Sequence, residues 1–346
     1  MYQLWEPAVL GPMTLRNRTI RSATNEHIAD SDGQFNQLWA DYQIELAQHD
    51  VGLVITGHLC VEPTQRADEG QPLLDDNADL SFLRCAAEGV HAAGAHIVAQ
   101  LSHSGPKSPP ALNGCPAKFP ADFTLEEMDD LVDKFVKAAL RCKEVGMDGV
   151  QVHCAHGYLL SSFLNPEQNL RTDEYGGSLE NRFRLPARIL TAIRAACGPE
   201  FALLAKADNN TTGDFHGLLS LFQSVGVDCV EVSGVDFAAY RGLKEPLFLQ
   251  AALEAREGID IPLALVGGIF SRKDAQAVLD AGIPFVSFSR ALICQPDFIS
   301  RMKAGEEESA CLACNKCYVV YRKRPVRCVL HTQPIPQLAK VFHTAE

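Results

Sequence analysis

Two histidines three residues apart are the most distinctive chemical groups in this sequence. His153 and His156 stand at the end of an apolar run, and Tyr158 follows two residues later. As paired hydrogen-bond donors, the two imidazoles could hold one substrate oxygen and stabilise negative charge that develops on it. They could instead be structural, or could ligate zinc, although no Asp or Glu stands where a third ligand would be expected. The Tyr158 phenol could act as a general acid or could pack beside the pair.

Other polar groups and glycines end the neighbouring apolar runs. Gln100 could bind the edge of a ring with one donor and one acceptor, or could be a satisfied rim amide. Lys206 could face negative charge that develops on a cofactor, or could extend into solvent. Gly267 and Gly268 allow close backbone approach, and the Arg290 guanidinium suits phosphate oxygens. The remaining run ends carry small or hydroxyl-bearing residues: Ala23, Thr24, Thr56, Gly57, Ser233, Gly234 and Ser289.

Eight apolar runs of strand length alternate with windows of helical periodicity. The runs are 18–22, 52–56, 96–101, 149–153, 201–206, 228–233, 262–266 and 284–289. The helical windows are 36–48, 80–93, 125–145, 179–196, 215–225, 246–256, 272–281 and 296–303. Thr124 and Glu127 form a capping-box pattern at the start of the third window. This alternation indicates parallel strands that are covered on both faces by helices.

A closed barrel and an open doubly wound sheet both fit this alternation. No Gly-x-Gly-x-x-Gly follows the first run, so the dinucleotide fingerprint of the open sheet is missing. Eight repeats favour the barrel. We therefore predict an α/β fold, a (β/α)8 TIM barrel over residues 1–305, with a cysteine-rich C-terminal extension over residues 306–346. In such a barrel the chemistry lies at the carboxyl ends of the strands, where the groups named above stand.

The composition is that of an acidic globular protein. The 346 residues include 43 acidic and 31 basic side chains, a net charge of −12, and 47% of the residues are hydrophobic. This charge disfavours nucleic acid and anionic membrane surfaces as partners. Neither a signal-peptide pattern nor an apolar run of transmembrane length occurs. We therefore expect a cytoplasmic protein whose 12 cysteines are mostly reduced.

Four clustered cysteines indicate a metal centre in the extension. Cys311, Cys314, Cys317 and Cys328 follow the pattern Cys-x2-Cys-x2-Cys-x10-Cys. Four thiolates suit tetrahedral zinc or a [4Fe–4S] cluster. The pattern alone leaves three outcomes open: an iron–sulfur cluster, zinc, or a vestigial site.

The segments 153–166 and 171–182 are the most diagnostic part of the sequence. They read HCAHGYLLSSFLNP and RTDEYGGSLENR. They closely resemble the old yellow enzyme family, the FMN-dependent barrels that include NADH:flavin oxidoreductases and 2,4-dienoyl-CoA reductase. The resemblance extends over nearly the whole barrel, including LRNR at 15–18, AQLSHSG at 99–105, VGGI at 266–269 and SRAL at 289–292.

The resemblance implies a cofactor role for most of the groups at the strand ends. Ala23 and Gly57 would contact the flavin ring through their backbone, and Thr24 would hydrogen-bond it near O4. Gln100 would bind the pyrimidine edge, and Lys206 would lie near N1 and the C2 carbonyl. The ribityl phosphate would be held at the last two strand ends, by Gly267, Gly268, Ser289 and Arg290.

The resemblance also implies the reaction. NAD(P)H would reduce FMN and leave, and an activated alkene would then accept hydride at its β-carbon. His153 and His156 would bind the carbonyl of this α,β-unsaturated compound, and Tyr158 would donate the proton. Larger relatives carry a [4Fe–4S] cluster at the position of the cysteine pattern, so such a cluster here would serve a separate electron-transfer partner. A homo-oligomer is also open.

Two other functions fit the same barrel. One is an amine- or ether-demethylating flavin dehydrogenase, and the other is a non-catalytic FMN-binding redox module. The histidine pair favours reduction of an activated alkene, because an amine needs carboxylates or an aromatic cage. The chain departs from relatives at Glu26, at Pro106-Lys107 and over 207–216, and these departures leave the substrate range open.

Overall fold

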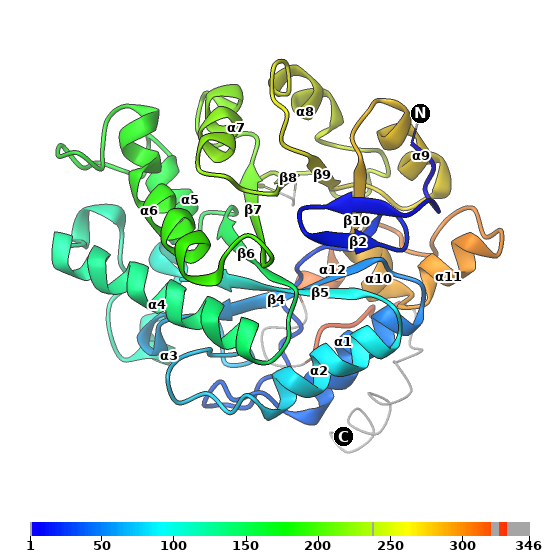
Figure 1. Cartoon of the computed structure of the whole chain (residues 1–346), viewed down its shortest axis with the longest axis horizontal. Helices are drawn as coiled ribbons and strands as arrows, with labels where there is room; N and C mark the ends of the chain where they lie inside the picture. The colour runs from blue at the N-terminus through cyan, green and yellow to red at the C-terminus, as the bar shows by residue number, and fades with distance from the viewer. Residues whose placement is uncertain (1, 237–238, 320–324, 331–346) are drawn as a thin grey trace.

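The eight apolar runs form a closed barrel of parallel strands, and helices surround it (Figure 1). The computed structural model describes residues 2–236, 239–319 and 325–330. Neighbouring strands pair in the order β10-β3-β4-β5-β6-β7-β8-β9, and β9 pairs with β10 to close the barrel. The predicted (β/α)8 fold is confirmed. The barrel strands are β3 (Thr19–Arg21), β4 (Leu53–Cys60), β5 (His96–Ser102), β6 (Gly149–Cys154), β7 (Ala202–Asp208), β8 (Cys229–Ser233), β9 (Leu263–Val266) and β10 (Phe285–Phe288).

A helix on the outside of the barrel follows each of these strands, and all eight overlap the predicted windows. In α4 the predicted capping box is present, because the Glu127 N–H donates to Thr124 Oγ1 at 3.1 Å and the Thr124 N–H donates to Glu127 Oε2 at 3.0 Å. Helix α8 starts later than predicted, and the Leu247 N–H before it donates to the Gly267 carbonyl. The helices are α1 (Gln37–Gln48), α2 (Ser81–Ala92), α4 (Leu125–Glu144), α6 (Leu179–Cys197), α7 (Phe215–Ser224), α8 (Leu249–Ala255), α9 (Arg272–Asp280) and α11 (Phe298–Lys303).

A β-hairpin that the sequence pattern did not predict covers the amino-terminal end of the barrel. Its strands β1 (Ala8–Leu10) and β2 (Met13–Leu15) pair antiparallel, and the hairpin is the dark blue ribbon in Figure 1. Leu10 and Leu15 pack with the apolar residues that start the barrel strands, such as Leu53 and Phe285. Three-residue strands give too little periodicity to be recognised in a sequence.

Short helices occupy several loops at the carboxyl-terminal end of the barrel. They are η1 (Pro63–Gln65), η2 (Gly105–Lys107), α3 (Pro110–Asn113), η3 (Pro120–Asp122), α5 (Leu159–Leu164) and α10 (Arg290–Cys294). Three of them, η2, α3 and η3, lie in the Pro-rich segment 105–123 that follows β5. No helix in the described part of the chain is long and apolar enough to span a membrane.

The start of the predicted extension packs onto loops at the carboxyl ends of the strands. The Gly242 N–H donates to the Ala313 carbonyl, and the Val326 N–H donates to the Glu26 carbonyl at 2.8 Å. A short helix, α12 (Lys316–Val319), lies between these contacts. Residues 320–324 and 331–346 of the predicted extension lie outside the described residues, so the boundary at residue 305 stays a prediction.

Candidate active site

The turn after β6 holds the predicted histidine pair, and the end of β7 fixes this turn. His156 and Gly157 adopt φ angles of 64° and 70°, in the left-handed region that a histidine rarely adopts. The Asp208 carboxylate accepts the His156 backbone N–H, and it also accepts the Ser161 hydroxyl at 3.0 Å. Asp208 therefore holds the strained turn that aims His156 across the end of the barrel.

The three predicted catalytic side chains lie together. Nε2 of His153 and Nδ1 of His156 are 3.2 Å apart, and the two rings meet edge to face. The Tyr158 ring centroid lies 4.8 Å from that of His153. Nε2 of His156 is 2.8 Å from the Ser233 hydroxyl at the end of β8. The structure thus joins groups from β6, its loop and β8.

A third histidine, which the sequence reasoning missed, joins this group from β4. The His58 ring lies 5.0 Å from the Tyr158 ring and 5.8 Å from the His153 ring. The predicted strand ended at Thr56, but β4 continues to residue 60 with a register irregularity between Ile55 and His58. The apolar residues that follow His58 in the sequence could have indicated that the strand continues. The register irregularity has no local sequence pattern.

Burial keeps these histidines neutral. It lowers the pKa of His58 to about 4, and it lowers the pKa of His153 and of His156 well below the ordinary value of 6.5. Nearby lysines and the neighbouring imidazoles act in the same direction. Burial also raises the pKa of Asp208 to about 6, although that carboxylate accepts the His156 N–H. Near pH 7 each imidazole therefore has one N–H to donate and carries no charge.

The sequence showed no Asp or Glu near the histidine pair that could be a third zinc ligand. In the fold, Asp208 brings a carboxylate to this place. Its Oδ1 lies 3.9 Å from Nε2 of His156. Within the described ranges, however, no set of three ligand atoms that includes His153 or His156 converges within 4.8 Å. The geometry therefore favours a hydrogen-bonding role for the pair over the zinc alternative.

A chain of buried polar side chains crosses the barrel next to the pair. The Gln100 Nε2 donates to Gln151 Oε1 at 2.7 Å, and the Gln151 Nε2 donates to Glu231 Oε2 at 3.2 Å. Lys206 Nζ lies 3.1 Å from Glu231 Oε2 and donates to Ser22 Oγ at 2.8 Å. The Lys206 side chain is 3% exposed, so it does not extend into solvent. Burial raises the pKa of Glu231, but Lys206 and the hydrogen bonds outweigh it and hold that pKa below its ordinary value.

The two glycines after β9 both adopt positive φ, 123° at Gly267 and 75° at Gly268. A Cβ on Gly268 would lie 1.8 Å from the Glu245 carbonyl oxygen. A neighbouring loop therefore already requires glycine at this position, for the close backbone approach that the sequence indicated. The phosphate role of the two glycines stays a prediction.

The end of β10 meets the C-terminal segment. The Arg290 guanidinium donates to Asn315 Oδ1. The Ser289 hydroxyl lies 2.9 Å from the Thr24 hydroxyl and 3.3 Å from the Tyr318 hydroxyl. The structure therefore brings together three of the predicted cofactor residues and adds Asn315 and Tyr318, whose places in the sequence gave no signal.

The backbone of Gly57 also packs closely, in this case against the side chain of Glu26. The Gly57 N–H donates to Glu26 Oε1 at 2.8 Å, and a Cβ on Gly57 would lie 2.1 Å from Glu26 Oε2. Burial raises the pKa of Glu26. Glu26, where the chain departs from relatives, is therefore buried with its carboxylate against Gly57. Ala23 is half-buried against the barrel interior.

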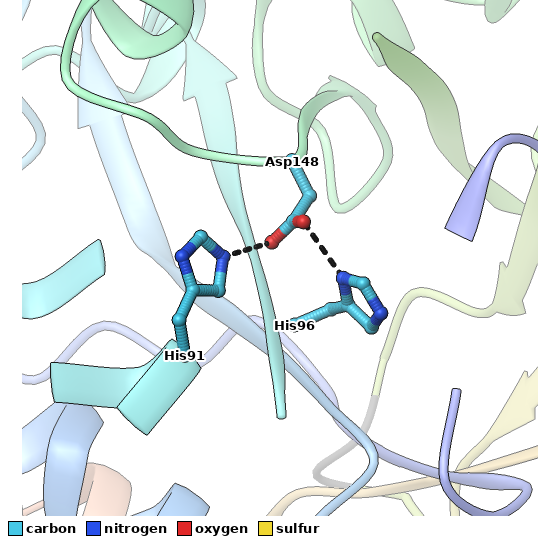
Figure 2. A group of neighbouring side chains, drawn as sticks. All are labelled: His91, His96 and Asp148. Carbon is cyan, nitrogen blue, oxygen red and sulfur yellow. Dashed lines mark hydrogen bonds and ion pairs between the residues drawn. The ribbon is translucent and has the colours of Figure 1, made fainter. Parts of the chain in front are cut away.

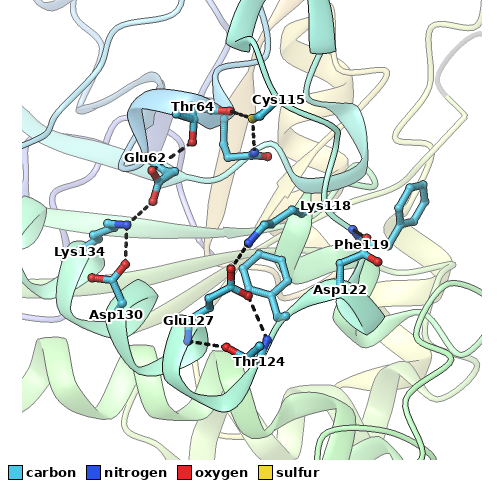
Figure 3. A network of polar contacts seen from close by, with 12 residues as sticks. Glu62, Thr64, Cys115, Lys118, Phe119, Asp122, Thr124, Glu127, Asp130 and Lys134 are labelled. Carbon is cyan, nitrogen blue, oxygen red and sulfur yellow. Dashed lines mark hydrogen bonds and ion pairs between the residues drawn. The ribbon is translucent and has the colours of Figure 1, made fainter.

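The segment 105–123 is fastened to the start of α4 by polar contacts (Figure 3). Lys118 pairs with Glu127, whose carboxylate also serves the α4 capping box. Cys115 donates to the Thr64 carbonyl at 3.3 Å, and Lys134 pairs with Glu62. These contacts connect the segments that follow β4 and β5 to one helix, so they hold the loop beside the site in place.

The four predicted metal-ligating cysteines lie close to a fifth. The side chains of Cys311 and Cys328 interact with Cys294 and raise the pKa of its thiol. Cys314 and Cys317 are half-buried nearby. In the part of the chain that the structure describes, no three of these sulfur atoms converge within 4.8 Å, the spacing that a single zinc ion needs. Cys294 lay outside the local pattern and was not predicted.

Known proteins resemble this chain over most of its length. Residues 3–309 match the NADH:flavin oxidoreductase / NADH oxidase family. A 4,4'-dithiodibutanoate disulfide reductase from Rhodococcus erythropolis is 30% identical over 91% of this chain and 92% of that protein. An NADH oxidase from Thermoanaerobacter brockii is 29% identical over 95% of this chain, which spans only about half of that protein, 56%. The structure of an old yellow enzyme homologue from Zymomonas mobilis has a TM-score of 0.78 at 24% identity, covers 89% of this chain and 95% of that chain, and supports the fold.

Proposed function

Because the chain belongs to the NADH:flavin oxidoreductase / NADH oxidase family of the old yellow enzyme type, we propose that it uses FMN and NAD(P)H to reduce the C=C bond of α,β-unsaturated carbonyl compounds. One observation carries the choice of substrate. His153 and His156 are held neutral by burial, side by side, with the Tyr158 ring against His153. Neutral paired donors suit a carbonyl oxygen that gains negative charge during the reaction.

The residues present fit FMN. Lys206 on β7 offers a buried cation, and Gln100 on β5 offers an amide, with β6 between the two strands. Nδ1 of His153 is buried and has no hydrogen-bond partner among the described residues, so a polar group bound beside it would satisfy it. Arg290 and the Ser289 hydroxyl stand at the end of β10, where barrels of this kind bind phosphate. When bound, FMN would supply the hydride exchange between NAD(P)H and the alkene.

The side chains of the chain would bind and polarise the substrate. A carbonyl oxygen held by the N–H groups of His153 and His156 draws electron density from the conjugated C=C bond, so the β-carbon becomes electrophilic. Asp208 holds His156 in position through its backbone N–H. Burial raises the pKa of Tyr158, so the phenol keeps the proton that it would deliver to the α-carbon.

The same surroundings disfavour the demethylase alternative. Lys206 and Lys107 both lie close enough to lower the pKa of the histidine pair. A cationic amine would meet the positive charge of these two lysines here. The matching relatives are named as oxidoreductases, which argues against a purely non-catalytic module.

Anaerobic stopped-flow spectroscopy tests the proposal. The FMN-loaded protein is reduced with NADH or NADPH and then mixed with cyclohex-2-enone. We expect rapid reoxidation, and cyclohexanone formed in D2O should carry deuterium on the α-carbon. Tyr158→Phe should slow formation of this product about 10²-fold or more. The proposal fails if no enone in a panel reoxidises the protein.

We also propose that Cys311, Cys314, Cys317 and Cys328 hold an iron–sulfur cluster. The sulfur atoms come close to one another without forming a ready-made single-ion site, and four thiolates suit such a cluster. Metal and sulfide analysis of anaerobically purified protein should find iron and acid-labile sulfide. Finding zinc alone would indicate a structural zinc site in place of the cluster. Finding neither iron nor zinc would overturn the proposal.

A further inference from the structure

A second group of histidines lies at the opposite end of the barrel from the proposed active site. His91 lies in the last turn of α2, His96 is the first residue of β5, and Asp148 directly precedes β6. Both imidazoles point to the Asp148 carboxylate (Figure 2). One ligand atom from each residue lies within 4.8 Å of the other two, and within the described ranges no other His, Cys, Asp or Glu triplet has this property.

The two hydrogen bonds of His96 indicate a proton or a metal cation between its ring and Asp148. Nε2 of His96 lies 3.2 Å from the carbonyl oxygen of Thr14, which can only accept, so Nε2 carries a hydrogen. In a neutral ring, Nδ1 would then be a bare lone pair facing Asp148 Oδ1 at 2.7 Å. Two acceptors do not face each other at this distance unless a proton or a metal cation lies between them.

We propose that His91, His96 and Asp148 bind Zn²⁺. Two imidazole nitrogens and one carboxylate oxygen are a ligand set that zinc favours, with water in the fourth position. The Thr14 carbonyl orients His96 as the outer partner of a metal-bound histidine does, and the Ile97 N–H orients Asp148 at 2.8 Å from Oδ2. Zinc bonds of about 2.0–2.1 Å hold ligand atoms roughly 3.3 Å apart. His91 and His96 contact different oxygens of Asp148, at 2.8 and 2.7 Å, so zinc binding would turn one carboxylate oxygen toward the ion and lengthen both contacts.

The position of the site indicates what bound zinc would do. It would join the end of α2 to the starts of β5 and β6, three segments that meet at the amino-terminal end of the barrel. In barrels of this kind that end contributes stability, and the opposite end carries the chemistry. His91 keeps 40% of its side chain exposed, so the ion can enter from solvent and keep a water ligand. Zinc here would therefore stabilise the fold and take no part in the reaction.

Isothermal titration with zinc chloride tests this site in the full chain. The tail thiolates would also bind zinc, so the background variant has Cys311, Cys314, Cys317 and Cys328 replaced by serine and is first treated with EDTA and dialysed. We expect one zinc per chain and a higher melting temperature with zinc. Adding His91→Gln should weaken binding at least ten-fold, because two ligands remain.

His49→Gln is the matched control, because His49 is also partly exposed and pairs with a single carboxylate, Glu45. It should leave zinc binding unchanged. If the serine background does not fold, zinc is counted in the unsubstituted chain, where His91→Gln should lower the stoichiometry by one. A background that takes up no zinc, or equal binding by His91→Gln, would mean that the cluster is an ion-pair network held by protons and would overturn the proposal.

Discussion

Histidines lie at the amino-terminal end of β5 and at the carboxyl-terminal end of β6, in opposite electrostatic surroundings. At the amino-terminal end, a hydrogen bond with Asp148 raises the pKa of His96. At the carboxyl-terminal end, burial lowers the pKa of His153 and His156. From this comparison we infer that the surroundings decide the role of a histidine. We expect the carboxylate partner to prepare one end for a cation, and burial to leave neutral donors at the other.

The largest effect is expected from the buried charge pair next to the neutral donors. Lys206→Met would leave Glu231 buried and unpaired, and breaking such a pair typically costs about 3–5 kcal/mol of unfolding free energy. Lys303→Met is the matched control, because Lys303 pairs with Asp50 at an exposed position and should contribute less than about 1 kcal/mol. Urea unfolding of the two variants measures the difference. Equal losses of unfolding free energy would mean that the buried Lys206–Glu231 pair stabilises the barrel no more than an exposed pair does.

The two ends should also respond to pH with opposite sign. The pKa of His58 falls to about 4 on folding, so between pH 6.5 and 4 the unfolded chain binds a proton that the folded chain refuses. Stability therefore decreases as the pH falls through this window, by up to roughly 3 kcal/mol at 1.36 kcal/mol per pKa unit. His58→Gln should remove this part of the decrease in urea unfolding with EDTA present.

His96 should show the reverse dependence in the same experiment. Its pKa is raised on folding, so its contribution is complete below pH 6.5 and is lost as the pH rises through the folded-state pKa. His96→Asn should therefore cost most at pH 5.5 and least at pH 9. If both variants changed the pH profile in the same direction, the comparison between the two ends would be wrong.

The smallest effect is expected where the C-terminal segment contacts the end of β10. Asn315 holds the Arg290 guanidinium, so Asn315→Ala should weaken FMN binding by about 1 kcal/mol, roughly five-fold in Kd, through a less well positioned arginine. Quenching of FMN fluorescence on titration with the apoprotein measures this. Asn77→Ala, at an exposed turn next to Asp75, should leave the Kd unchanged. An unchanged Kd in Asn315→Ala would show that the C-terminal segment does not contribute to FMN binding.

The barrel could be predicted from the sequence because it depends on local patterns. Apolar runs and helical periodicity located all eight strands and their helices, and the strand-end rule selected His153, His156 and Lys206. The partners of these residues could not be predicted. Glu231 sits within the next strand, and Asp208 lies two residues past the predicted end of its strand, so their contacts depend on barrel register. The amino-terminal cluster was missed for a related reason, because Asp148 lies 52 residues from His96 and precedes the next strand.

The most direct test of the account is the rate at which cyclohex-2-enone reoxidises the reduced, FMN-loaded His156→Ala variant. FMN content and circular dichroism first establish that the variant is folded and loaded, and His49→Ala serves as the control. Loss of one donor to a developing oxyanion typically costs about 10²–10³-fold in rate. We predict a loss of this size in His156→Ala and none in His49→Ala. Reoxidation of His156→Ala at the wild-type rate would contradict the assignment of the histidine pair to the substrate oxygen.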